Sequence, residues 1–303
     1  MYDKTDPRAA LAAAKPGDML SRTGLVAEPQ AAQFQGTAPQ IVDDAGESWL
    51  HRGHNFLVAY SQAVPGGRFE RIGQVDEYAV LLPEAGARIT WEGTVAEVPG
   101  FSLAFVPPGD SSVEMPGGGT LVRIFSTRSA DLAALCGNAG GYAVARDHIP
   151  PFAPWPDPPE GWKLRSYSLD VAPEPGRFGR IFRCTTLMIN ILDPFEGPRD
   201  PAKMSPHHHD DFEQGSLALS GDFTHYLRWS WTSDMSDWRP DAALEMPAPS
   251  MLVIPPPVIH TTRATGPGSN LLIDIFGPPR EDFSAKAGWV LNAEDYPVPS
   301  PKG

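Results

Sequence analysis

Short apolar runs alternate with turn residues along almost the whole chain. Runs with the apolar pattern of strands cover residues 55–64, 77–82, 87–91, 102–106 and 120–126, and then residues 181–192, 216–219, 223–231, 250–254 and 270–276. Glycine and proline recur between these runs, which is typical of strands joined by turns. The pattern therefore predicts an all-β protein, built as a sandwich or a barrel.

Helix signals are scarce. Asp6 can cap a short helix through the stretch "RAALAAA", with Pro7 in its first turn, and residues 131–135 predict a second short helix. The 34 prolines and 29 glycines are distributed through all 303 residues. This distribution supports many short strands rather than one disordered tract.

One segment of the chain occurs twice. The stretch "VAEVPGFSLAFVPPGDSS" (residues 95–112) aligns without a gap with "ALEMPAPSMLVIPPPVIH" (residues 243–260). Ser102 falls on Ser250, Pro107 on Pro255 and Ser112 on His260. We therefore expect one β-domain to be present in two copies.

The repeat and the proline distribution predict the domain boundaries. The stretch "HIPPFAPWPDPPEGW", residues 148–162, is typical of an extended linker. We expect an N-terminal arm at 1–44, a first domain at 45–147, a second domain at 163–289 and a C-terminal tail at 290–303.

Composition excludes several classes of partner. The formal net charge of −13 disfavours nucleic acid and anionic membranes as partners, because both require a positive surface. No apolar run approaches a membrane span, and the N-terminus lacks a basic lead with an apolar stretch. The two cysteines, Cys136 and Cys184, do not form a disulfide framework. We expect a cytoplasmic protein that acts on a small molecule and forms a homo-oligomer, most simply a dimer.

The histidines suggest a metal site in the second copy only. His207, His208 and His209 stand in a row, and His260 ends the repeated segment. The first copy has Ser112 in place of His260 and no histidine in the segment that matches the row, so the scaffold does not need these side chains. On a strand, His207 and His209 face the same side while His208 faces away. With His260 from a neighbouring strand they would offer three nitrogen ligands and leave open positions on the metal.

These residues resemble the two motifs of the cupin family. The first motif matches His207-x-His209, Gln214 and Gly221, and the second matches the Pro255-Pro256-Pro257 frame with His260. The resemblance covers both copies and implies two jelly-roll (double-stranded β-helix) barrels in tandem, that is, a bicupin with a divalent metal in the C-terminal barrel only. The implied ligands are His207, His209, His260 and Gln214. Iron(II) is favoured, nickel, zinc and manganese are alternatives, and no organic cofactor is expected.

Three positions depart from the cupin pattern. Gln214 stands where the family usually has glutamate, Pro257 replaces a glycine and Ala264 replaces an asparagine. Glu213 is the alternative ligand, although the spacing to Gly221 favours Gln214. If Gln214 is the ligand, Glu213 is a candidate catalytic base beside the metal.

The stretch "DFTHYLRWSWT" that follows the first motif provides candidate substrate contacts. On an uninterrupted strand His225, Trp229 and Trp231 share one face, which would line the barrel near the metal. The same tryptophans are also compatible with an ordinary apolar core.

Two classes of function follow from the resemblance. The first is a metal-dependent oxidoreductase, a dioxygenase acting on a small aromatic or carboxylated substrate at a three-histidine centre. Its enzymatic alternative is a lyase, hydrolase or isomerase that uses the metal as a Lewis acid. The second class is a bicupin that binds a small ligand without catalysis.

Overall fold

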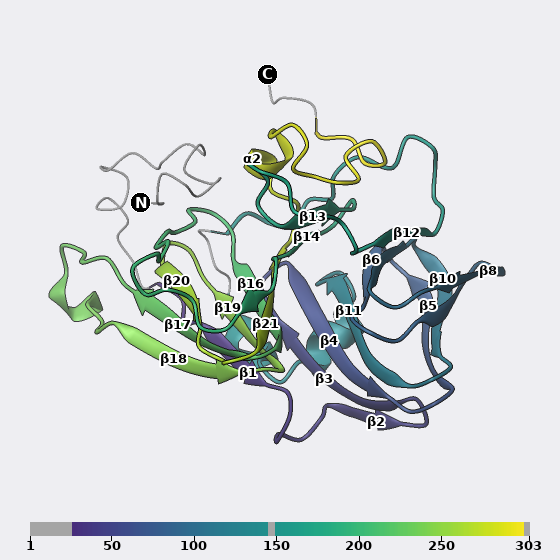
Figure 1. Cartoon of the computed structure of the whole chain (residues 1–303), viewed down its shortest axis with the longest axis horizontal. Coiled ribbons are helices and arrows are strands. Elements are labelled where there is room, and N and C mark those ends of the chain that lie inside the picture. The colour runs from purple at the N-terminus through teal and green to yellow at the C-terminus, as the bar shows by residue number, and fades with distance from the viewer. Residues whose placement is uncertain (1–25, 145–148, 300–303) are drawn as a thin grey trace.

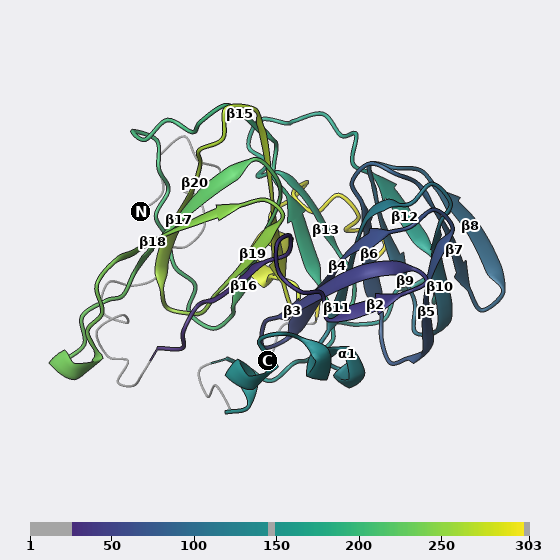
Figure 2. The same cartoon turned by 90° about the horizontal axis from the view of Figure 1, so that it is seen from below.

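The computed structural model describes residues 26–144 and 149–299. Two units, each built from one large and one small antiparallel sheet, lie side by side (Figures 1 and 2). The all-β jelly-roll class predicted from the sequence is confirmed. The short helix expected after Asp6 lies outside the described residues.

The N-terminal barrel consists of a seven-stranded and a four-stranded sheet. The large sheet has the order β12-β9-β6-β11-β4-β3-β2, with bounds Arg165–Ser168, Ser102–Val106, Tyr78–Leu82, Gly119–Ser126, Phe56–Ala63, Gly46–Arg52 and Ile41–Asp43. The small sheet has the order β5-β10-β7-β8, with bounds Gly67–Gln74, Gly109–Met115, Ala87–Trp91 and Thr94–Val98.

The C-terminal barrel repeats this plan. Its large sheet has the order β1-β19-β16-β21-β14-β13, with β15 also paired to β21, and bounds Gln30–Gln33, Ser250–Ile254, Gln214–Ser220, Ser269–Phe276, Met188–Ile191, Arg180–Arg183 and, for β15, Phe195–Glu196. Its small sheet has the order β18-β17-β20, with bounds Ala242–Pro247, Asp222–Arg228 and Ile259–Ala264.

Short helices fill a few connections. The helix predicted at residues 131–135 is α1, Ala130–Leu135, and it is followed by the 3₁₀ helix η2, Ala139–Tyr142. The 3₁₀ helix η3, Met235–Asp237, lies in the β17–β18 connection, and α2, Glu281–Ser284, follows β21. Among the helices of the described residues, none has the length and apolar character needed to cross a membrane.

The repeat seen in the sequence has a counterpart in the strand order. β9 and β19 carry the aligned segments, and each is the second strand of its large sheet. β9 lies between the edge strand β12 and β6, and β19 lies between the edge strand β1 and β16. β10 and β20, which follow them, both pair with the strand that opens the small sheet's hairpin. Ser112 and His260 therefore occupy equivalent places on equivalent strands.

Each large sheet is completed by a strand from outside its own barrel. β12 follows the proline-rich linker but pairs with β9 of the N-terminal barrel. β1 belongs to the N-terminal arm but pairs with β19 of the C-terminal barrel (Figure 1). Both additions cover a sheet edge, where unpaired backbone groups would otherwise be exposed. The domain boundaries proposed from the sequence stay a prediction.

The main core lies between the two large sheets. One continuous cluster of buried side chains combines residues of both barrels, among them Tyr60, Leu81 and Phe105 with Ile189, Leu217 and Ile275. Because side chains alternate along a strand, the next residues face the inside of each barrel. Inside the N-terminal barrel these form a second apolar cluster. Inside the C-terminal barrel part of this inner surface is polar, and the histidines lie there.

The buried imidazole of His51 predicts a loss of stability in acid. Its Nε2 lies 3.0 Å from the carbonyl oxygen of Gln30, so it donates to this oxygen and ties β3 to β1. Burial lowers the pKa of His51 from 6.5 to about 4. Between these pH values His51 therefore binds a proton in the unfolded chain but not in the folded chain. The contribution is complete above pH 6.5 and is lost as the pH falls toward 4, up to about 3 kcal/mol.

Denaturant unfolding of the wild type and of His51→Gln between pH 8 and pH 4 measures this effect. A glutamine amide can still donate to Gln30 but does not titrate, so the variant should lose less stability in acid. The difference at pH 8 records any change in packing alone. Parallel curves for the two proteins over the acid range would contradict the assignment.

Candidate metal centre

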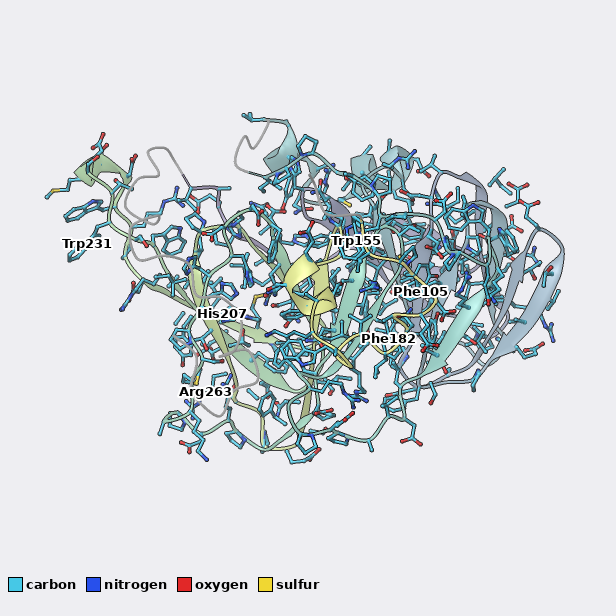
Figure 3. The ribbon with its side chains drawn as sticks, turned by 90° about the horizontal axis from the view of Figure 1, so that it is seen from above. Phe105, Trp155, Phe182, His207, Trp231 and Arg263 are labelled. Carbon is cyan, nitrogen blue, oxygen red and sulfur yellow. The ribbon has the colours of Figure 1, made fainter. Side chains whose placement is uncertain are left out.

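Three histidines converge inside the C-terminal barrel. His207 and His209 precede β16, and His260 is the second residue of β20. The ring centres lie 5.1 Å apart for His207 and His209, 4.4 Å for His207 and His260, and 5.2 Å for His209 and His260. One nitrogen of each ring lies within 4.8 Å of the others, which is close enough to hold one metal ion. Figure 3 shows His207 within this barrel, away from the central core residues Phe105 and Phe182.

Backbone pairing brings the two histidine segments together. His207 and His260 form an isolated antiparallel bridge in which each backbone N–H donates to the other's carbonyl, at 3.0 and 2.7 Å. In antiparallel strands directly opposed side chains point to the same face. The bridge therefore aims both imidazoles into the barrel, and His209, two residues further, follows them. His208 faces away and lies 3.6 Å from Asp210.

Two hydrogen bonds set the tautomers of His207 and His260. Nδ1 of His207 lies 2.9 Å from the carbonyl oxygen of Ser205, and Nδ1 of His260 lies 2.9 Å from that of Val258. A carbonyl oxygen only accepts, so each Nδ1 carries a proton, and Nε2 is the atom that can bind a metal. Metal-binding histidines commonly have this arrangement, because it orients the ring and leaves the ligand atom available.

Gln214 joins the triad through its amide. Its Oε1 accepts from Nε2 of His209 at 2.9 Å, while its Nε2 donates to Asp274 and Ser216, each at 3.0 Å. Ser216 also donates to the same Asp274 oxygen at 3.2 Å. The carboxylate can only accept from the amide nitrogen, so it turns the amide oxygen toward the histidines. Neighbouring ligands of an octahedral ion lie about 3 Å apart, so Oε1 is placed to serve as a fourth ligand.

Asp274 is a functional candidate that the sequence analysis missed. It lies on β21 opposite Ser216 and is buried. The available signal was one acidic residue inside the apolar run "NLLIDIFG", at the position where the first copy has Arg123. Buried carboxylates in such runs need partners and often mark a site.

The surroundings keep His209 neutral. Burial, the nearby Arg280 guanidinium and the other two imidazoles all hold the pKa of His209 well below its usual value. A neutral imidazole is the form that binds a metal. Three imidazoles and a carboxamide therefore fit a divalent cation by their donor chemistry.

Two histidines of the triad, His207 and His260, line a cavity of about 500 Å³. His207, His260, Gln214 and Asp274 form part of its wall, and most of the remaining wall is apolar. Its polar side chains also include Arg199, Lys203 and the hydroxyl residues Ser205, Thr261 and Thr262. A structural metal site is usually closed by four protein ligands, whereas this one faces a space that a small molecule can enter.

Glu213, predicted as a base beside the metal, is not brought to the histidines. It precedes Gln214 on the chain, and the alternation of side chains turns it to the opposite face of the large sheet. Its carboxylate accepts from the backbone N–H of His54 at 2.6 Å and from the Tyr142 hydroxyl at 3.3 Å. Glu77, at the equivalent place in the N-terminal barrel, likewise accepts from the backbone N–H of Thr185 in the other barrel. Both glutamates join the barrels.

The three predicted substrate contacts do not line the cavity beside the triad. His225 is buried, with Nδ1 2.9 Å from the Thr262 hydroxyl. Burial, and then the neighbouring His260, lower the pKa of His225 to about 3. Trp229 packs on a separate apolar cluster with Arg239 over its ring. Trp231 is 67% exposed and stacks on Trp238 at the far tip of the β17–β18 hairpin (Figure 3). The reason is that β17 ends at Arg228, so strand alternation does not extend to the tryptophans.

The N-terminal barrel fills the equivalent space with other side chains. Ser112 stands at the place of His260, and Tyr78 at the place of Gln214. The Tyr78 ring stacks on Phe125 with centres 4.7 Å apart, and the Arg123 guanidinium lies over Phe69 at 4.5 Å. Among the described residues, the histidine triad is the only cluster with metal-ligand geometry.

Comparison with solved structures relates this fold to oxalate decarboxylases. Oxalate decarboxylase of Lactobacillus farciminis, solved as a formate complex, aligns with a TM-score of 0.57 and 14% identity over 85% of this chain and 88% of that chain. A variant of the Bacillus subtilis enzyme aligns with a TM-score of 0.55 and 14% identity, covering 84% of this chain and 78% of that chain. No protein-family model and no curated protein matches the sequence. The fold is therefore that of the cupin, or jelly-roll, proteins.

Arg199 is expected to position His207 through the loop between them. Its guanidinium donates to the carbonyl oxygens of Lys203 and Thr262, at 2.7 and 3.0 Å, and to the Ser205 hydroxyl at 3.1 Å. These bonds hold the loop whose Ser205 carbonyl orients the His207 ring. Arg199→Met should therefore weaken metal binding about 10–100-fold, the usual effect of losing such a supporting contact.

Competition with a chelator, using metal-loaded protein, measures this effect. Arg228→Met is the matched control, because Arg228 pairs with Asp241 on the exposed face of the same barrel. Wild-type metal affinity in Arg199→Met, or an equal loss in both variants, would contradict the positioning role.

Proposed function

We propose that the protein is a metal-dependent cupin enzyme of the lyase type, which removes a carboxyl group from a small organic acid. The observation that carries the proposal is the histidine triad, two of whose members, His207 and His260, line a cavity of about 500 Å³ with Gln214 and Asp274 in the same wall. The structural likeness to oxalate decarboxylases supports the lyase reaction over the other reactions that a cupin metal centre can perform.

The metal would act as a Lewis acid. His207, His209 and His260, with Gln214, would hold it, and a bound divalent metal supplies a Lewis acid that polarises a carboxylate or carbonyl oxygen. Iron(II), manganese, nickel and zinc are all compatible with imidazole and carboxamide ligands, and iron(II) remains our first proposal. Because the protein ligands are neutral, the charge of the metal is available to an anionic substrate.

Other side chains of the cavity complete the chemistry. Lys203 adds a positive charge to the wall of the cavity in a chain whose net charge is −13, which favours entry of an anion. The apolar walls exclude water from the reacting carbon. Loss of carbon dioxide breaks one carbon–carbon bond and leaves an electron pair on carbon that must take up one proton. Asp274 is the carboxyl group of the cavity wall that could hold this proton.

The dioxygenase expected from the sequence would use the same triad, so the products must separate the two reactions. The protein is prepared anaerobically, its metal is identified by mass spectrometry, and it is then assayed with a panel of carboxylic acids. Release of carbon dioxide without stoichiometric oxygen consumption supports the lyase. Consumption of one oxygen molecule per substrate would overturn it in favour of the dioxygenase. Saturable binding of the acids without any turnover would instead indicate a ligand-binding protein.

A further inference from the structure

The cavity beside the triad is large and mostly apolar. Its volume of about 500 Å³ corresponds to on the order of 15 water molecules. Six large apolar side chains line it: Phe178, Leu192, Phe195, Met204, Phe223 and Leu272. A short dicarboxylate bound at the metal would leave most of this wall in contact with water. The wall therefore fits a ligand whose apolar part displaces that water.

The deep part of the apolar wall is already packed. Phe223 on β17 and Leu272 on β21 are 2% and 4% exposed, and both belong to one small cluster with Ala218 and Ala264. Side chains in such a cluster have few alternative positions. The inner surface of the cavity is thus formed before any ligand enters, so binding an apolar body there costs little rearrangement.

Phe195 is an exposed aromatic side chain of the cavity wall. Phe195 lies on the two-residue strand β15 and is 36% exposed, with the Arg199 guanidinium 5.7 Å from its ring centre. The Arg199 nitrogens donate to protein oxygens. Arg199 therefore stabilises the wall of the cavity and is not placed to bind a substrate carboxylate with two hydrogen bonds. The cavity thus combines two groups that attract an anion, the metal centre and Lys203, with a wall that is otherwise mostly apolar.

We propose that the substrate is a monocarboxylate with an apolar body about the size of an aromatic ring, and not a two-carbon dicarboxylate. The inference that the substrate carries a carboxylate rests on the proposed function, since it assumes a metal held by the triad. The inference that the substrate has an apolar body rests on the residues that line the cavity.

Binding of four probes to the metal-loaded full-length protein tests the inference. Calorimetry compares acetate and oxalate with phenylacetate and cyclohexylacetate. The two acids with a ring should bind at least about tenfold more tightly than acetate and oxalate, because only they cover the apolar wall. Tighter binding of oxalate than of phenylacetate would overturn the proposal.

A pair of variants locates the apolar contact. Phe195→Ala should weaken phenylacetate binding about tenfold and leave acetate binding unchanged, and Phe195→Leu should restore most of the loss. Tyr226→Ala is the matched control, because Tyr226 is 38% exposed on the outer side of the same barrel. Unfolding temperatures of the three variants verify that each is folded. Equal weakening of acetate and phenylacetate, or an equal effect of Tyr226→Ala, would contradict the assigned wall.

Metal-free protein separates this inference from the proposed function. If metal removal abolishes acetate binding and greatly weakens phenylacetate binding, both proposals are supported. If phenylacetate binds equally with and without metal, the apolar site stands and the metal-bound carboxylate fails. If oxalate and acetate bind only with metal and phenylacetate does not bind at all, the metal centre stands and the apolar body is wrong.

Discussion

Replacing His260 with alanine should strip the protein of most of its metal. His260 supplies one of three imidazoles, and its ring is held by the Val258 carbonyl so that Nε2 is available as a ligand. Two histidines and an amide bind a divalent metal far more weakly than three histidines do, and we expect affinity to fall by more than about 100-fold. Metal analysis after dialysis against a weak chelator measures the loss.

The internal repeat provides the control for this variant. Ser112 occupies the equivalent position on β10 of the N-terminal barrel, where Tyr78 and Arg123 fill the interior. Ser112→Ala should therefore leave the metal content unchanged. Equal metal loss in the two variants would show that the triad is not the metal centre.

Replacing Glu213 with alanine should destabilise the protein without removing its metal. The buried carboxylate accepts from the His54 backbone N–H and the Tyr142 hydroxyl, both contributed by the N-terminal barrel. Hydrogen bonds to a charged group contribute about 1.5–3 kcal/mol each, and their loss leaves two partly buried donors without this acceptor. We expect the free energy of unfolding to fall by about 3 kcal/mol and the melting temperature to fall by roughly 5–10 °C.

Asp211→Ala controls for the loss of an acidic side chain in this segment, because Asp211 is exposed and only two residues away. It should change neither stability nor metal content. Calorimetric melting and metal analysis of both variants give the two readouts. Normal stability of Glu213→Ala combined with lost turnover would instead support the catalytic role expected from the sequence.

The apolar pattern along the chain predicted the bounds of several strands correctly. Residues 87–91 and 102–106 were expected as strands with the same bounds as β7 and β9. The expected strand 223–231 was too long, because β17 stops at Arg228 and the chain then leaves the sheet. This end depends on where β18 and β20 stop pairing with β17, which neighbouring residues along the chain do not reveal. The positions proposed for Trp229 and Trp231 failed for that reason.

Gln214 and Glu213 show the same limit within the site. Their order in the sequence left open which side chain reaches the histidines. Alternation places them on opposite faces of β16, but only the packing of two large sheets decides which face is the barrel interior. Gln214 meets His209 and Asp274 inside the barrel, while Glu213 meets the other barrel.

The sequence by itself determined the β class, the repeat and the histidine triad, because each leaves a periodic or paired signal along the chain. Apolar alternation reports which residues can form strands, and the presence of His260 where the first copy has Ser112 reports a site confined to one barrel. Only the tertiary structure decided the exchange of β1 and β12 between sheets, the partnership of Asp274 with Gln214 and the apolar wall of the cavity. These features join residues far apart in the chain, and their energy comes from contacts that exist only once both barrels have packed.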